Sequence, residues 1–186
     1  PYAAGRYSLM DQDKFYSHLD PFHKFRLDWI NPFLAPSKGC YNLPNIEETG
    51  DVVVLMDPSV GAKEYFLIEN RQHYLSGFED LNDEGLAIWH IVEDPVARLL
   101  LPPGTDYGVW TDPDNQGWAR KVIRMIRPTI PQPIHHENAL WKAPPHSVQD
   151  YDIHLQWANG SDSGFSVGYI SSPGEIMRFN ITTPWN

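Results

Sequence analysis

The chain has 186 residues, which predicts one packed domain and no second independent one, since single cores commonly hold about 100 to 200 residues. Hydrophobic residues make up 41% and aromatic residues 13%, enough apolar surface to offset the loss of chain entropy, so global disorder is excluded. The net charge of -10 disfavours a nucleic-acid partner, and the longest apolar runs are far shorter than the roughly twenty residues of a membrane span.

The single cysteine and the first residue give two further expectations. Cys40 has no partner for an internal disulfide, and no Cys/His spacing of the zinc-finger type is present, so Cys40 is expected to be a small packing residue. The chain begins at Pro1 rather than Met and has no charged-then-apolar leader, which predicts a processed product or a fragment.

The first regular pattern lies in residues 20–29. Pro21 suits a first helical turn, and Phe22, Phe25 and Trp29 recur at helical spacing, so this segment is predicted to be a helix. Residues 1–10 predict an irregular turn.

After Asn31-Pro32 the apolar runs shorten to strand length and are separated by Pro and Gly, which is typical of β structure. The expected fold class is α+β, mostly β: a short N-terminal helix followed by an antiparallel β-sandwich or open barrel of about seven strands. The predicted strands are residues 51–56, 64–70, 86–92, 121–126, 152–157, 165–170 and 175–181.

Residues 64–70 and 86–92 are predicted to pair as neighbours in one antiparallel sheet. The link between them is polar and carries turn residues such as Gly77 and Asn82-Asp83, rather than the helix that a parallel crossover needs.

Three sequence patterns resemble the immune inhibitor A family of secreted zinc metallopeptidases. Tyr7-Ser-Leu-Met-Asp11 resembles a Met-turn, the turn beneath the zinc, and a segment like the one that follows it in the family begins at Pro21. Glu64-Tyr-Phe-Leu-Ile-Glu-Asn-Arg-Gln72 and Asp83-Glu-Gly-Leu-Ala-Ile-Trp-His-Ile91 resemble two successive strands of the family, and residues 138–141 and 163–180 resemble its terminal hairpin.

The resemblance implies a secreted zinc endopeptidase that acts on polypeptides, but the zinc motif H-E-x-x-H is absent. His135-His-Glu-Asn138 has no second His four residues on. In the family the zinc helix precedes the Met-turn, so zinc and activity are expected only with an upstream zinc-bearing segment. The chain alone is expected to be inactive, with residues 1–31 a catalytic-domain remnant that carries Met10 as zinc floor and residues 32–186 a β-rich domain.

Three polar residues in the predicted strands are candidate site residues. Alternation places Glu69 and Arg71 on one face of their strand, which favours a structural ion pair, with a role in the wall of a substrate cleft as the alternative. His90 lies between Trp89 and Ile91, which favours a hydrogen-bonded core imidazole over a ligand.

A calcium loop is the other metal hypothesis. Asp112 and Asp114 occupy the first and third positions of such a loop and Gly117 the sixth, but Ile123 stands where the loop requires Glu. Calcium binding and a plain turn both remain open.

The alternative function is a β-sandwich module that binds carbohydrate or peptide through its aromatic side chains. Exposure of five tryptophans separates the two functions, since buried rings indicate packing and a row of exposed rings indicates binding. These residues are Trp89, Trp110, Trp118, Trp141 and Trp157.

Overall fold

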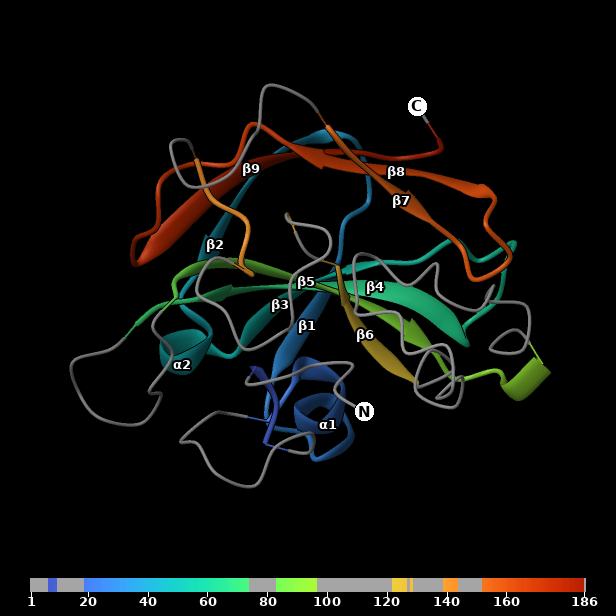
Figure 1. Cartoon of the computed structure of the whole chain (residues 1–186), viewed down its shortest axis with the longest axis horizontal. Helices are drawn as coiled ribbons and strands as arrows, with labels where there is room; N and C mark the ends of the chain where they lie inside the picture. Colours follow the sequence, from blue (N-terminus) through green and yellow to red (C-terminus); the bar gives the residue numbers. More distant parts are fainter. Residues whose placement is uncertain are drawn as a thin grey trace, which may run out of the picture.

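In the computed structural model, two β-sheets stack face to face and helix α1 (Pro21–Arg26) packs against the outer face of one of them (Figure 1). Within the described residues no helix is long and apolar enough to cross a membrane. The structure describes residues 7–9, 19–73, 83–96, 122–126, 128, 139–143 and 152–185.

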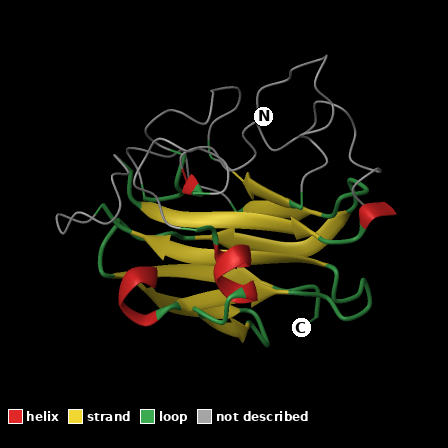
Figure 2. Cartoon of the chain, turned by 90° about the horizontal axis from the view of Figure 1, so that it is seen from below, coloured by secondary structure: helices red, strands yellow, loops and turns green. Residues whose placement is uncertain are grey.

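One sheet has five strands, in the order β1-β3-β4-β5-β6. The edge strand β1 runs parallel to β3, and the other neighbours pair antiparallel. Every residue of β4 and β5 is buried, because the second sheet covers one face and α1 with residues near it covers part of the other (Figure 2). The strands are β1 (Asn31–Leu34), β3 (Asp51–Leu55), β4 (Glu64–Arg71), β5 (Gly85–Val92) and β6 (Ile123–Ile126).

The second sheet has four antiparallel strands, in the order β2-β9-β8-β7. The chain enters this sheet through β2 before a short helix, α2 (Ile46–Thr49), returns it to the first sheet. Its strands are β2 (Gly39–Pro44), β7 (Ile153–Gln156), β8 (Asp162–Gly168) and β9 (Ile176–Thr182).

Strand alternation divides the apolar side chains into two cores. Phe66 and Ile68 of β4 point between the sheets, where they join Phe165 and Phe179 of the second sheet. Leu67 of β4 points to the opposite face, which lies towards α1. The second core therefore joins the helix and Tyr7 to the outer face of the five-stranded sheet.

Helix α1 is shorter than the predicted residues 20–29. The Asp20 side chain caps it by accepting a hydrogen bond of 3.0 Å from the backbone N–H of His23. It ends at Arg26 because Leu27 takes the C-cap position and Asp28 has a left-handed backbone with φ of 61°.

The mostly β, sandwich-like fold predicted from the sequence is confirmed. Each of the seven predicted strands is present, and residues 64–70 and 86–92 pair antiparallel within β4 and β5 as expected. Two edge strands, β1 and β2, were not predicted, and the β1–β3 pair is parallel rather than antiparallel. The two sheets have separate strand orders, which favours the sandwich over the open barrel.

Candidate functional site

The predicted site residues of β4 and β5 are buried side chains. Glu69 and Arg71 lie on the α1 face of the five-stranded sheet, and His90 lies on the opposite face between the sheets. All three side chains are fully buried. Met10, Asp112 and Asp114 lie outside the described residues.

The guanidinium of Arg71 joins three parts of the chain. Its Nε donates to Glu69 Oε1 at 2.6 Å, which forms the ion pair that strand alternation predicts. Its Nη1 donates to the carbonyl of Tyr7 at 2.6 Å, and its Nη2 donates to the carbonyl of Leu19 at 3.3 Å. The guanidinium also lies 5.6 Å from the ring centroid of Trp89.

The Glu69 carboxylate has two further partners besides Arg71. The indole Nε1 of Trp89 donates to Glu69 Oε1 at 3.0 Å, and Lys24 Nζ of α1 lies 3.7 Å from Glu69 Oε2. Two cations and an indole donor thus compensate one buried carboxylate, as charge burial requires. Together with Tyr7, Ser8 and their side-chain partners, which are described next, these side chains form a set that we call the Arg71 cluster. It comprises Tyr7, Ser8, Asp20, Lys24, Glu69, Arg71, Asp83 and Trp89.

Tyr7 and Ser8 are fixed by their side chains as well as by the Tyr7 carbonyl. The Tyr7 hydroxyl donates to Asp83 Oδ2 at 2.9 Å, and Ser8 Oγ donates to Asp20 Oδ2 at 2.5 Å. Burial, reinforced by the Asp83 carboxylate, raises the pKa of Tyr7 far above its ordinary value, so the hydroxyl stays a donor. Tyr7 and Ser8, which precede Met10 by three and two residues, are therefore fixed by hydrogen bonds to Asp83, Asp20 and Arg71.

Asp83 completes this part of the Arg71 cluster. Besides Tyr7, it accepts a hydrogen bond from the backbone N–H of Leu140 at 2.9 Å and forms an ion pair with Lys142. Because its carboxylate receives donors from residues far apart in the sequence, Asp83 joins the start of β5 to residues 139–143.

Ser8, Asp20 and His23 meet, but not in the order that nucleophilic catalysis requires. Asp20 stands between the other two, accepting from Ser8 at 2.5 Å and contacting His23 Nδ1 at 2.8 Å. In a serine hydrolase the imidazole stands between the hydroxyl and the carboxylate. The arrangement is consistent with helix capping rather than with a nucleophile.

His90 belongs to a second polar network, between the sheets. Its Nε2 bonds Glu64 Oε1 at 2.8 Å and its Nδ1 lies 3.2 Å from Nη2 of Arg124, which can only donate. His90 is thus neutral with its proton on Nε2. Burial, together with the Arg124 charge, lowers the pKa of His90 to about 4 against the opposing effect of Glu64.

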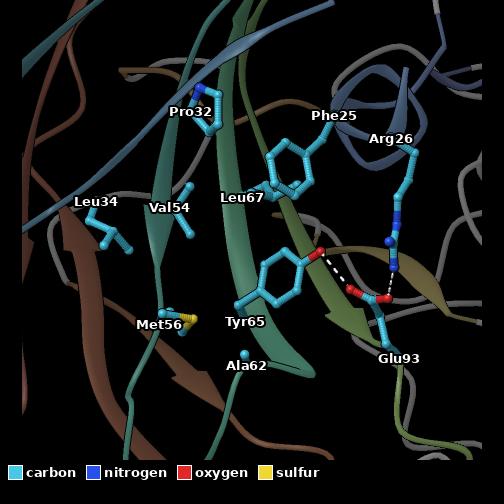
Figure 3. Close-up of a pocket in the computed structure, with 10 residues that line it drawn as sticks. All are labelled: Phe25, Arg26, Pro32, Leu34, Val54, Met56, Ala62, Tyr65, Leu67 and Glu93. Carbon is cyan, nitrogen blue, oxygen red and sulfur yellow. Dashed lines mark hydrogen bonds and ion pairs between the residues drawn. The ribbon is translucent and has the colours of Figure 1, made fainter. Parts of the chain in front are cut away.

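An apolar pocket of about 350 Å³ opens on the α1 face of the five-stranded sheet, beyond the helix (Figure 3). At one end, Tyr65 donates from its hydroxyl to Glu93 Oε1 at 3.0 Å, and Arg26 of α1 forms an ion pair with the same carboxylate. Burial and the Glu93 charge raise the pKa of Tyr65 well above its ordinary value. The other lining residues are Phe25, Pro32, Leu34, Val54, Met56, Ala62 and Leu67.

Comparison with known proteins gives no identification: no family model, curated protein or solved structure matches the chain. Metal ligands are also missing from the part of the chain that the structure describes, where no three His, Cys, Asp or Glu side chains gather as a metal site would need.

Sequence reasoning did not single out several residues of these sites. Tyr7, Asp20, Lys24 and Asp83 were not singled out as site residues, although Tyr7 and Asp83 each begin one of the family-like patterns. The charge of Asp83, at the start of such a pattern, was the signal that could have marked it as a site residue. The pocket left no comparable signal, because its walls come from α1, β1, β3, β4 and the residues after β5.

Proposed function

We propose that this chain supplies the part of a secreted zinc endopeptidase that follows the zinc-binding helix: the turn carrying Met10, and a β-rich support for the substrate cleft. One observation carries the proposal. The three patterns that resemble the metallopeptidase family meet at the Arg71 cluster: Tyr7 comes from the first, Glu69, Arg71 and Asp83 come from the second, and Leu140 of the third donates its backbone N–H to Asp83.

The Arg71 cluster has the properties that the support of a catalytic turn requires. A residue beneath a metal ion must be held to a fraction of an ångström, which demands packed side chains and hydrogen bonds to the segment that carries it. Tyr7 and Ser8 receive that restraint from Arg71, Asp83 and Asp20, at distances of 2.5 to 2.9 Å. We therefore assign Arg71 and Asp83 as positioning residues.

The described residues do not fit a zinc ion by themselves, since they gather no ligand set. In this proposal the ligands and the water-activating carboxylate come from a zinc-bearing segment of the same protein, and the substrate is a polypeptide. The chain by itself then has no peptidase activity.

The test compares the chain alone with the chain joined to the zinc-bearing segment encoded with it. Casein hydrolysis that a chelator abolishes is expected from the joined polypeptide and not from the chain alone. Tyr7→Phe in the joined polypeptide removes the hydrogen bond to Asp83 and is expected to lower kcat more than it changes KM, while circular dichroism stays unchanged. Chelator-sensitive hydrolysis by the chain alone, or none by the joined polypeptide, contradicts the proposal.

A second candidate function is a non-catalytic β-sandwich module that binds peptide or carbohydrate. The apolar pocket beside α1 favours the peptide version. The tryptophans give less support to the carbohydrate version, because Trp89, Trp141 and Trp157 are buried and Trp110 and Trp118 lie outside the described residues. Among the described residues one tryptophan, Trp29, is largely exposed, at 65%.

A further inference from the structure

The pocket beside α1 has the size and the walls of a binding site for one residue-sized group. Its volume of about 350 Å³ lies near the lower end of the range for ligand pockets, about 300 to 1,000 Å³. It exceeds the cavity of about 150 Å³ that is known to accept benzene. A single Leu-sized or Phe-sized side chain fits this space.

The floor of the pocket is a fixed apolar surface. Val54 of β3 and Leu67 of β4 come from adjacent paired strands, and the Tyr65 ring stands beside them (Figure 3). Two of the walls are exposed apolar side chains, Phe25 at 44% and Leu34 at 56%. An apolar group that enters the pocket therefore removes both itself and these walls from water, which drives binding.

The rim of the pocket carries both signs of charge. Glu93 and Arg26 form an ion pair there, and both side chains remain partly accessible to solvent. A carboxylate can accept a hydrogen bond from an amide N–H, and a guanidinium can donate one to an amide carbonyl. An amide group offers this rim both a donor and an acceptor, whereas an acyl chain or a simple hydrocarbon forms no hydrogen bond with it.

Strand addition at the neighbouring sheet edge is a poor alternative. The backbone N–H groups of Asn31 in β1 and of Ala35 just after it bond carbonyls on the β3 side, so those of residues 32 and 34 face the open side. Pro32 has no N–H, so Leu34 carries the one backbone N–H of β1 that faces the open side. A strand that pairs at this edge would therefore find a single donor. Recognition at this surface thus depends on the pocket.

We infer that this pocket binds an apolar amino-acid side chain of a polypeptide, with the flanking peptide amide at the Arg26–Glu93 rim. The inference adds a ligand class to either function above, and it stands on the pocket's geometry rather than on zinc. It can therefore be tested with the chain alone, where no peptidase activity is needed.

The test uses the chain with ¹³C-labelled methionine methyl groups and N-acetyl-leucinamide as the probe. Met56 lines the pocket, whereas Met125 and Met177 are buried elsewhere and serve as internal references. Saturable movement of the Met56 signal is expected, with Kd in the millimolar range, about 1 to 10 mM. N-acetyl-lysinamide is expected to bind at least tenfold more weakly. An unmoved Met56 signal, or equal binding of the two amides, overturns the inference.

Two further measurements test whether binding takes place in the pocket and whether the amide groups of the probe contribute to it. Ala62→Trp at the mouth is expected to weaken N-acetyl-leucinamide binding at least tenfold, whereas Val60→Trp, in the same loop but outside the lining, leaves it unchanged. Isoamyl alcohol, which carries the leucine side chain without amides, is expected to bind more weakly. Equal binding of the alcohol, or no effect of Ala62→Trp in a folded variant, contradicts the assignment to peptides.

Discussion

The Arg71 guanidinium donates a hydrogen bond of 2.6 Å to the backbone carbonyl of Tyr7, a residue 64 positions earlier in the chain. The same guanidinium is paired with Glu69, and no part of either side chain reaches solvent. Arg71 therefore couples the charge balance of the sheet to the position of the N-terminal segment, so a change at this residue affects both.

Arg71→Met is expected to lower the free energy of unfolding by about 3 to 5 kcal/mol, because it leaves the Glu69 carboxylate buried without its strongest partner. Arg178→Met is the matched control, since Arg178 is exposed on β9 and its loss is expected to change stability by less than about 0.5 kcal/mol. Urea unfolding measures both. A loss below about 1 kcal/mol for Arg71→Met contradicts a charge-compensating role.

Asn70, between Glu69 and Arg71, serves the opposite face of β4. Its Nδ2 lies 3.0 Å from the carbonyl oxygen of Leu43 and 3.1 Å from that of Gly174, both in or next to the second sheet. The Glu-Asn-Arg run thus holds α1 and Tyr7 on one side and the second sheet on the other. This gives a structural reason for a polar triplet inside a buried strand.

Asn70→Ala is expected to destabilise the fold by about 2 to 4 kcal/mol, since it removes the amide that donates to the carbonyls of Leu43 and Gly174 and accepts from the Gln72 side chain. Asn42→Ala, at an exposed position of β2, is the control and is expected to be nearly neutral. Thermal unfolding compares the variants. Equal midpoints for Asn70→Ala and Asn42→Ala show that Asn70 does not hold the two sheets together.

The neutral imidazole of His90 predicts a pH dependence of stability. The pKa of His90 is about 4 in the folded chain and about 6.5 in the unfolded one, so between these values the unfolded chain binds more protons. The contribution of neutral His90 to the free energy of unfolding is complete above about pH 6.5. It is lost as the pH falls towards 4, by about 3 kcal/mol in all.

His90→Gln removes this titration and keeps a donor and an acceptor for Glu64 and Arg124. The free energy of unfolding of the wild type is expected to fall more steeply between pH 6.5 and 4.5 than that of the variant. Guanidinium titrations of both proteins at four pH values in this range give the difference. Parallel curves refute the assignment, whatever the other carboxylates contribute to the common slope.

Part of this structure could be predicted from the sequence because the relevant interactions are local. Alternation along residues 64–71 places Glu69 and Arg71 on one face, and the polar link before Gly85 favours an antiparallel pair; the structure has both features. The edge strands escaped prediction because β1 contains Pro32 and β2 contains Gly39 and Pro44, which weaken a strand signal but are tolerated at a sheet edge.

The candidate sites could be predicted only in part, because they depend on contacts between distant segments. Nothing in the sequence near Tyr7 indicates that its hydroxyl meets Asp83, 76 residues away. The pocket likewise depends on where α1 ends above β3 and β4, and Asp28 sets that end with a left-handed backbone that the helical spacing of Phe22, Phe25 and Trp29 does not reveal.

Gly85, at the start of β5, is the position where a small side chain is expected to do the most damage. Its φ of +146° is rarely adopted by other residues, and an added Cβ would lie 2.6 Å from the carbonyl oxygen of Trp141. That carbonyl accepts the Leu86 N–H at 2.8 Å in the bridge beside Asp83, so it cannot move away without breaking the bridge. Gly85→Ala is therefore expected to lower the free energy of unfolding by about 2 to 4 kcal/mol, from backbone strain and the lost bridge.

Gly39→Ala on edge strand β2 is the control, because nothing lies within 4 Å of its Cβ position, and it is expected to be neutral or slightly stabilising. Urea unfolding followed by tryptophan fluorescence compares the two variants, and a Gly85→Ala variant as stable as Gly39→Ala means that residues 139–143 do not pack on β5 as described.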